Sequence, residues 1–282
     1  GWSKEINERI ETFLNTTLTM NIRKVAVFDG DGTVVGQAPH YLADEALYRY
    51  ADKFYKGKSD KFSKEKMAIL NRMVKDGNNV GKAYVEDRAH FLAGMTPEEV
   101  ANLGYDCYVE SYQGKFYPEM KQLIANLKEY GFEFWILTAS PEFLYQKFLS
   151  EELGIPEVNI LGMKSVVVNG VLTNEIVLPI PQDDGKANVI PTFIKTRPLV
   201  VGGNSRGDMD MLNQSCGLKI VVNPDDKTVR GPEDGPMNGL TVKGYWEKEG
   251  AVIVRSNDVR DPKVRFHTSE WGIRENAINP KE

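Results

Sequence analysis

Two aspartates stand one residue apart directly after an apolar run, in the stretch VAVFDGDGTVVG at residues 25–36. The apolar run reads as a buried strand, so Asp29 and Asp31 are expected at its buried end. An unpaired carboxylate held away from water costs roughly several kcal/mol. A bound cation, together with a reaction at the site, is one arrangement that offsets this cost.

Three further polar features follow strands or begin helices later in the chain. Thr138 ends the apolar stretch FEFWILT, Lys186 stands at the start of a helix, and residues 204–208 follow the strand PLVVGG. Ligands of open parallel α/β sheets bind beyond the carboxyl ends of the strands, so these side chains are expected to gather with the two aspartates. Carboxylates, a hydroxyl and a lysine in one place suit phosphoryl transfer with a divalent cation.

The two aspartates suit different steps of such a reaction. The carboxylate of Asp29 can attack phosphorus and form an aspartyl-phosphate, which divides one displacement into two. Asp31 can protonate the leaving oxygen and then deprotonate the attacking water. Mg²⁺ prefers oxygen ligands and offsets the repulsion between carboxylate and phosphate. Mg²⁺ is therefore the expected cofactor, and a small phosphorylated molecule is the expected substrate.

The phosphoryl oxygens need hydrogen-bond donors and positive charge. The hydroxyl of Thr138 can hold them together with nearby backbone N–H groups, for which Gly30 and Ala139 are the expected positions. Lys186 supplies a positive charge where negative charge gathers. Taken alone, Thr138 reads as an ordinary strand-end hydroxyl and Lys186 as a surface lysine at a helix start. Their order along the chain favours the functional interpretation.

The paired aspartates have two other interpretations. An EF-hand calcium loop needs Gly at its sixth position and Glu at its twelfth, where Val34 and His40 stand. A structural turn needs no bound group at all. Both interpretations leave the later polar residues unexplained, so we rank them below phosphoryl transfer.

The elements that must position these residues alternate between helices and strands. Residues 3–20 have helical spacing, and residues 39–114 read as helices without a convincing strand, one of them starting at the Thr96-Pro97-Glu98-Glu99 cap. Strands are predicted at 24–28, 132–138, 198–203 and 218–222, with a further strand and a hairpin turning at Asn169-Gly170 between them. This alternation predicts an α/β fold with a parallel sheet. The last 50 or so residues are expected to form short strands or ordered loops.

Four motifs in this order resemble those of the haloacid dehalogenase superfamily of aspartate-nucleophile phosphohydrolases. They are FDGDGT, FWILT, the lysine of DDGKA, and GGNSRGDMDML, and the likeness spans roughly residues 20–225. It implies a Rossmann-like parallel-sheet core made of 1–38 and 115–282, with a C-terminal extension from about 226. Residues 39–114 then resemble the inserted all-α (type I) cap of the phosphoserine-phosphatase-like branch. A cap implies hinges near 36–39 and 114–118.

By this resemblance Asp29 is nucleophile and metal ligand, and Asp31 is the general acid and base whose backbone carbonyl also binds Mg²⁺. The acidic residues after the fourth strand complete the metal site, which assigns Asp208 to it. The first residue of the fourth motif, normally Asp, is Asn204 in this chain. An amide oxygen still coordinates Mg²⁺ but with one negative charge fewer, so weaker metal affinity is expected. Asn204 thus leaves both an active and an inactivated site open.

The leading hypothesis is a Mg²⁺-dependent phosphomonoesterase that hydrolyses a small phosphorylated metabolite through an aspartyl-phosphate. Phosphoserine is disfavoured because the phosphatases that act on it carry a Glu shortly after the first motif, where this chain has Gln37. One alternative is a phosphorylcholine or phosphoamino-alcohol phosphatase, since the Trp2-containing helix and aromatic residues of 41–55 resemble such members. A phosphotransferase of the same family is another. A catalytically impaired phosphate- or metal-binding protein, motivated by Asn204, is the alternative from a different class.

Bulk composition limits the partners of the chain. The 282 residues carry a formal net charge of −5 and no long basic run, which argues against nucleic acid as partner. No apolar stretch approaches the roughly 20 residues of a membrane span. The chain is therefore expected to be soluble. Because it begins with Gly1, removal of a leader stays open, so both a cytoplasmic protein and an exported protein with its leader removed are expected possibilities. Composition leaves the oligomeric state, monomer or dimer, open.

Overall fold

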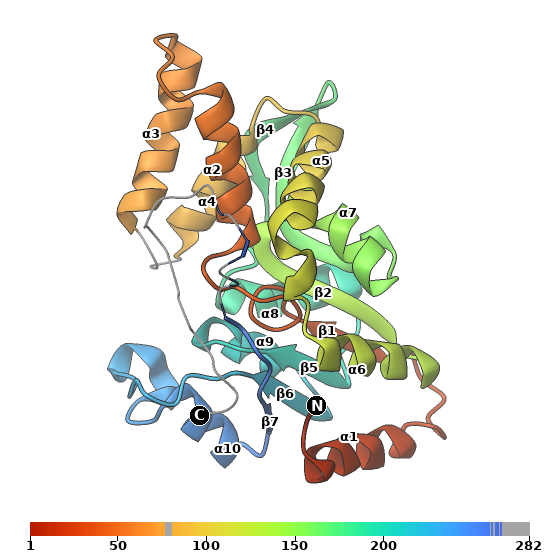
Figure 1. Ribbon diagram of the computed structural model, residues 1–282. Coiled ribbons are helices and arrows are strands. Elements are labelled where there is room, and N and C mark those ends of the chain that lie inside the picture. The colour runs from red at the N-terminus through yellow and green to blue at the C-terminus, as the bar shows by residue number, and fades with distance from the viewer. Residues whose placement is uncertain (77–80, 260, 262, 265, 267–282) are drawn as a thin grey trace.

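The computed structural model describes residues 1–76, 81–259, 261, 263, 264 and 266, and its strands form one sheet (Figure 1). The strands are β1 (Val25–Phe28), β2 (Glu133–Pro141), β3 (Ile160–Val168), β4 (Val171–Val177), β5 (Val200–Gly203), β6 (Leu218–Val222) and β7 (Val252–Val254). Their order across the sheet is β4-β3-β2-β1-β5-β6-β7, and neighbouring strands are parallel except for β3 and β4. The predicted α/β fold with a mainly parallel sheet is confirmed, and β1 lies in its middle.

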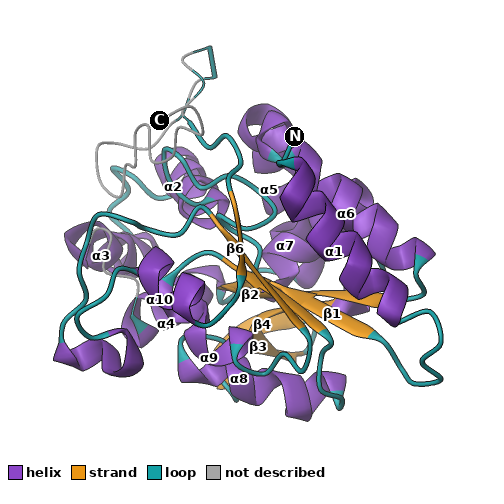
Figure 2. Cartoon of the chain, turned by 90° about the horizontal axis from the view of Figure 1, so that it is seen from below, coloured by secondary structure: helices purple, strands orange, loops and turns teal. Residues whose placement is uncertain are grey.

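Helices cover both faces of the sheet (Figure 2). Ala26 and Phe28 of β1 pack in one apolar cluster, with α1 (Lys4–Thr16), α6 (Pro118–Glu129) and α7 (Glu142–Leu153). Val25 and Val27 point to the other face and pack with α8 (Asp184–Val189), α9 (Met209–Leu212) and α10 (Val242–Lys248). A strand buried on both faces needs apolar residues at every position, which explains the run VAVF. Within the described residues, no helix has the length and apolar character that crossing a membrane requires.

The chain between β1 and β2 is helical. It forms α2 (Leu42–Phe54), α3 (Lys61–Asp76), α4 (Lys82–Leu92) and α5 (Pro97–Cys107), which Figure 1 shows above the main sheet. The predicted helix start is confirmed, because the Thr96 hydroxyl accepts a bond from the Glu99 N–H and the Glu99 carboxylate accepts one from the Thr96 N–H. Helix α5 packs tightly on α7, since a Cβ at Gly104 would lie 1.9 Å from the Leu144 carbonyl oxygen. We call residues 39–114 the helical insertion.

The predicted hairpin is present, but its first strand is longer than the sequence suggested. Asn169 and Gly170 have φ angles of 50° and 80° and join β3 to β4 in the expected tight turn. The strand that the sequence placed before the hairpin is the first half of β3, which runs parallel to β2, while its second half pairs with β4. Leu172 of β4 also exchanges backbone hydrogen bonds with Gly94 and Met95, which ties the hairpin to the insertion.

The C-terminal extension contains more regular structure than predicted. Instead of only short strands and loops, it includes helix α10, whose Trp246 is fully buried against the sheet. Strand β7 pairs in parallel with β6 and completes the sheet edge. The apolar pattern of both elements is weak, because β7 has three residues, of which Val252 and Val254 are buried, and α10 buries only one face.

The two linkers between the insertion and the sheet pair with each other and with the C-terminal segment. The Gly36 N–H donates to the Lys115 carbonyl at 2.8 Å. Asp258, which is buried, accepts bonds from the N–H groups of Gln37 (3.0 Å) and Ala38 (3.2 Å) and from Lys115 Nζ (2.7 Å). A Cβ at Gly36 would lie 2.5 Å from Asp258 Oδ1, so crowding explains this glycine. Hinge motion at these linkers stays a prediction.

Candidate active site

A buried lysine lies between two aspartates that come from different strand ends. Lys186 Nζ donates to Asp29 Oδ1 and to Asp208 Oδ1, each at 2.7 Å. Asp29 follows β1, Asp208 follows the neighbouring strand β5, and Lys186 lies in the first turn of α8. Because β1 and β5 are parallel and adjacent, their carboxyl ends open at the same edge of the sheet. The structure brings these three residues together, and their roles stay predictions.

The second carboxylate oxygen of Asp29 and the amide oxygen of Asn204 lie near the same hydroxyl, that of Thr33. Thr33 Oγ1 lies 3.4 Å from both Asp29 Oδ2 and Asn204 Oδ1, so these two oxygens approach the same hydroxyl. Gly32 has a φ of +79°, and a Cβ there would lie 2.2 Å from Asn204 Nδ2. The loop after β1 therefore needs glycine both for its left-handed backbone and for the close approach of Asn204. Thr33 was not singled out from the sequence, although it belongs to the same motif.

Asp31 points away from the lysine, toward β2 and α7. Its Oδ2 accepts a hydrogen bond from Ser140 Oγ at 3.0 Å, and its Oδ1 accepts one from the Tyr145 hydroxyl at 2.8 Å. Burial raises the pKa of Asp31 above its ordinary value, and these two hydrogen bonds oppose the rise. No sequence pattern predicted that Tyr145 contacts Asp31, because an aromatic residue on an apolar helix face usually belongs to the core.

Thr138 lies within β2, which continues three residues beyond the predicted strand end, and stands beside the loop that carries the aspartates. It is 1% exposed, and its Oγ1 accepts a hydrogen bond from the Ser140 N–H at 3.1 Å. A Cβ built on Gly30 would lie 3.7 Å from the Thr138 Cβ, so the two residues are neighbours across β1 and β2. Ala139 continues β2 directly after Thr138. Three of the four predicted phosphate-binding positions, Gly30, Thr138 and Ala139, therefore lie close together.

Asp208 uses both of its carboxylate oxygens within the loop. Oδ1 bonds to Lys186, and Oδ2 accepts the backbone N–H groups of Asn204 (2.9 Å) and Ser205 (3.1 Å). Asp208 is the last residue of a turn of 3-10 helix (Arg206–Asp208), and the four residues of α9 follow it directly. These bonds fix the loop and the lysine, a geometry that favours a supporting role for Asp208 over direct metal ligation.

The charge balance of the cluster suits a divalent cation. Three buried carboxylates, Asp29, Asp31 and Asp208, stand with Lys186 as the cation hydrogen-bonded to two of them. Burial and the neighbouring Asp208 raise the pKa of Asp29 to about 7, which marks uncompensated negative charge. In the described parts of the chain no three His, Cys, Asp or Glu side chains are grouped to hold a metal. A Mg²⁺ site at this cluster would draw on Asp29, the amide oxygen of Asn204 and backbone oxygen, ligands that Mg²⁺ accepts.

A second charged group reaches the site from the helical insertion, and the sequence reasoning missed it. Arg88 of α4 is 2% exposed and its Nε donates to Asp44 Oδ1 at 3.0 Å. Its guanidinium lies 5.2 Å from the ring centre of Tyr41 and 4.9 Å from that of Tyr84. The charge of Arg88 lowers the pKa of Asp31, so the insertion acts electrostatically on the cluster. Residues 44 and 88 are far apart in sequence, and no local pattern links them.

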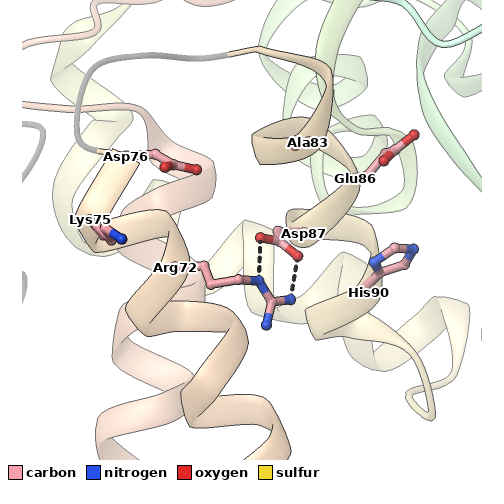
Figure 3. Close-up of a pocket in the computed structure, with 7 residues that line it drawn as sticks. All are labelled: Arg72, Lys75, Asp76, Ala83, Glu86, Asp87 and His90. Carbon is pink, nitrogen blue, oxygen red and sulfur yellow. Dashed lines mark hydrogen bonds and ion pairs between the residues drawn. The ribbon is translucent and has the colours of Figure 1, made fainter.

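The cluster is covered rather than open. Its members are at most 8% exposed: Asp29, Asp31, Thr138, Lys186, Asn204 and Asp208. A cavity of about 310 Å³ lies elsewhere, between α3 and α4, where Arg72 forms two hydrogen bonds with Asp87 (Figure 3). A second cavity of about 400 Å³ lies beside α6 and includes none of the cluster residues. Burial keeps these six side chains largely away from solvent in this conformation.

Known proteins share this sequence pattern and fold. The haloacid dehalogenase-like hydrolase family matches residues 26–213. The protein named phosphoserine phosphatase SerB1 from Mycobacterium tuberculosis (strain ATCC 25618 / H37Rv) is 24% identical over 246 residues, which cover 84% of this chain and 73% of that protein. The putative hydrolase ML2424 from Mycobacterium leprae (strain TN) is 24% identical over 216 residues, which cover 73% of this chain and 68% of its own length.

Solved structures show the same fold at lower identity. A protein of unknown function from Bordetella pertussis Tohama I has a TM-score of 0.61 and 16% identity, with 83% of this chain and 99% of that chain covered. A conserved protein of unknown function from Anaerococcus prevotii DSM 20548 has a TM-score of 0.60 and 17% identity, with 80% and 87% covered. These two likenesses establish the fold alone.

The family match extends from β1 to the end of α9, so it includes both strand ends that carry the carboxylates, and Lys186 between them. It covers more than half of the chain, and the order of elements agrees with the motifs found in the sequence. The chain therefore belongs to the haloacid dehalogenase-like hydrolase family, and it is a hydrolase related to a protein named phosphoserine phosphatase.

Proposed function

We propose that this chain is a Mg²⁺-dependent phosphomonoesterase that forms an aspartyl-phosphate on Asp29. The observation that carries the proposal is the position of Lys186 Nζ, 2.7 Å from both Asp29 and Asp208. A buried ammonium beside a nucleophilic carboxylate is suited to receive the phosphoryl oxygens as the carboxylate attacks. The related phosphoserine phosphatase from Mycobacterium tuberculosis supports the same reaction class.

In the first step a carboxylate oxygen of Asp29 bonds to phosphorus while the ester P–O bond breaks. Asp31 gives its proton to the departing alkoxide, so the alcohol leaves neutral. Burial that raises the pKa of Asp31 favours the protonated form this step requires. Lys186, the Thr138 hydroxyl and the backbone N–H groups of Gly30 and Ala139 are proposed to hold the phosphoryl oxygens.

In the second step water attacks phosphorus and releases inorganic phosphate from Asp29. Asp31, now ionised, takes the proton of the attacking water and returns to its starting state. When bound, Mg²⁺ would supply positive charge opposite the phosphoryl group, held by Asp29, the backbone carbonyl of Asp31 and the amide oxygen of Asn204. Asp208 would keep Lys186 and the loop at 204–205 in place.

Asn204 does not by itself argue for an inactive protein. Its Oδ1 and Asp29 Oδ2 both lie 3.4 Å from Thr33 Oγ1, so the amide oxygen stands in the same cluster as the carboxylate. The remaining carboxylates retain enough negative charge to attract a divalent cation. We therefore favour an active enzyme with weakened metal affinity over the impaired phosphate- or metal-binding protein.

The substrate is proposed to be a small phosphorylated metabolite without a quaternary ammonium. An aromatic cage for such a cation needs open ring faces. The guanidinium of Arg88 lies over one face of Tyr41 and one face of Tyr84, and its positive charge would repel a second cation. This observation disfavours phosphorylcholine. A phosphotransferase remains the second candidate, because an acceptor alcohol competes with water for the same aspartyl-phosphate.

Phosphate release from a panel of metabolite monophosphates, with Mg²⁺ present, tests the proposal. The wild-type chain is expected to release phosphate from at least one member, and Asp29→Asn is expected to lower kcat by about a thousandfold or more. Asp226→Asn, on the surface beside Arg255, serves as the matched control and is expected to keep full activity. Equal release by wild type and Asp29→Asn would show that Asp29 is not the nucleophile.

A further inference from the structure

We propose that Tyr145 is a positioning residue that holds the carboxyl group of Asp31 and joins it to the first turn of α2 in the helical insertion. This inference rests on the proposed function, in which Asp31 protonates the leaving oxygen. Tyr145 lies on α7, in the part of the fold that carries the sheet, and it belongs to no sequence motif noted above. Its hydroxyl is the direct link between Asp31 and the insertion.

The hydroxyl of Tyr145 contacts Ala43 and Asp31, with Ser140 also near it, and chemistry fixes the direction of the bond from Ala43. It lies 3.2 Å from the backbone N–H of Ala43, which can only donate. The single hydroxyl proton is then free for Asp31 Oδ1, 2.8 Å away. A phenylalanine at position 145 would therefore remove a donor from Asp31 and an acceptor from Ala43 at once.

The two oxygens of Asp31 are held by two different donors. Tyr145 holds Oδ1, and Ser140 Oγ holds Oδ2 at 3.0 Å. Bonds to both oxygens fix the rotation of the carboxyl group about its last side-chain bond, which a single bond would leave free. The ring of Tyr145 is fully buried and packs against Phe148 with ring centres 5.1 Å apart, so the donor itself is rigid.

The link to Ala43 makes the orientation of Asp31 depend on the insertion. Ala43 lies in the first turn of α2, where backbone N–H groups have no partner within the helix. The residue before α2, Tyr41, caps it without a side-chain hydrogen bond, so the Tyr145 hydroxyl supplies one of the missing acceptors. When α2 is seated, the same hydroxyl is oriented toward Asp31. One buried hydroxyl therefore contacts both Asp31 and the first turn of α2 in the helical insertion.

A purely structural role for Tyr145 makes a different prediction from a positioning role. A structural tyrosine would lower kcat for every substrate by the same factor when mutated. A positioning residue for the acid matters most where the leaving group needs a proton, because a stable leaving anion departs without one. The fall in kcat for esters with poor leaving groups, compared with the fall for esters with good ones, therefore separates the two roles.

The experiment measures kcat and KM of Tyr145→Phe with phenyl, 4-nitrophenyl and 2,4-dinitrophenyl phosphate in Mg²⁺. We expect kcat for phenyl phosphate to fall at least about tenfold more than kcat for 2,4-dinitrophenyl phosphate, with KM for each substrate nearly unchanged. Ser140→Ala is expected to show the same trend to a smaller extent. An equal fall for all three esters would overturn the positioning role.

Tyr108→Phe is the matched control. Tyr108 is buried in the same aromatic cluster and stacks on Phe148. Its hydroxyl, however, bonds to Glu152 and not to Asp31. It is expected to lower all three rates equally or not at all. A leaving-group trend in Tyr108→Phe as large as that in Tyr145→Phe would also overturn the inference, because loosened packing alone would then explain it.

A crystal structure of Tyr145→Phe tests the inference without any turnover. We expect the Asp31 carboxyl group to rotate away from its wild-type orientation, and an unchanged orientation would overturn the role of Tyr145. Failure of the proposed function would be seen separately, as equal phosphate release by wild type and Asp29→Asn. The orientation of Asp31 in the crystal and the phosphate release of Asp29→Asn are separate measurements, so a failure of the inference is distinguished from a failure of the proposed function.

Discussion

Single charges decide how this site behaves, because it is buried. Lys186 satisfies one oxygen each of Asp29 and Asp208 and leaves the pKa of Asp29 raised to about 7. Removing one partner of such a buried pair typically costs about 3–5 kcal/mol, since the remaining charge stays uncompensated. At position 204 the chain carries an amide where the family pattern has an acid, which keeps the surplus of negative charge smaller before the metal binds.

Asn204→Asp is expected to change stability in opposite directions with and without metal. Without metal, a fourth carboxylate joins three others and lowers the melting temperature of the protein. With Mg²⁺, the added ligand charge tightens binding by about tenfold, equivalent to about 1.4 kcal/mol, so the Mg²⁺-induced rise in melting temperature becomes larger. Thermal unfolding over a Mg²⁺ titration measures both effects.

The matched control for this change is Asn102→Asp on the surface of α5, where Asn102 bonds to Lys147. It adds the same charge far from the carboxylates and is expected to leave the Mg²⁺ response as in wild type. A Mg²⁺ response of Asn204→Asp no larger than that of wild type would contradict the place of residue 204 in the metal site.

The linkers are the elements that join the insertion to the sheet, and a segment from the far end of the chain holds them. Asp258 accepts bonds from Gln37, Ala38 and Lys115, and Lys115 Nζ also bonds to the Val259 carbonyl at 2.8 Å. Both linkers are thereby fixed through one buried carboxylate. The C-terminal extension thus contributes to the geometry of the insertion as well as to the sheet edge.

Asp258→Asn is expected to lower the free energy of unfolding by about 3 kcal/mol. The amide cannot neutralise Lys115, and its NH₂ group can face a backbone N–H where the carboxylate accepted one. Urea unfolding measures the loss. Asp226→Asn is the control, because its pair with Arg255 is largely exposed and is expected to contribute less than about 1 kcal/mol. Equal losses in both variants would show that the buried contact adds no special stability.

For the molecule as a whole, stability depends on pH through buried ionisable groups. Lys66 of α3 donates to the carbonyls of His90 and Ala93 at the end of α4, each at 2.8 Å. Burial lowers its pKa from 10.5 to about 8. Between these values the unfolded chain binds more protons than the folded one, so this group makes stability rise as pH increases.

Lys66→Met is expected to remove this rise. The difference in unfolding free energy between wild type and variant should grow by about 1–2 kcal/mol from pH 8 to pH 10.5, after allowance for solvent screening. Chemical denaturation at several pH values measures it. Lys61→Met, at an exposed position of the same helix, is the control and is expected to leave the pH dependence unchanged. A constant difference across this range would contradict the lowered pKa of Lys66.

The sequence by itself determined the α/β fold and the family, and it placed Asp29 directly after a strand and Lys186 at the start of a helix. Apolar runs that are buried on both faces have a distinct pattern, and the polar residues that end them lie at one edge of a parallel sheet. The motifs are local, so each can be recognised from a few neighbouring residues of the sequence. Helix α10 escaped prediction, and β7 was expected only as a short strand without a position, because both elements are short.

Only the tertiary structure decided how the insertion meets the carboxylates. The bond from Tyr145 to Asp31, the pairing of Arg88 with Asp44 and the hold of Asp258 on the linkers each join residues more than forty positions apart. None of these pairs has a spacing rule, because their contacts arise from the packing of elements and not from the geometry of one helix or strand. A buried charge needs a partner, but the sequence alone does not say which residue the fold will bring to it.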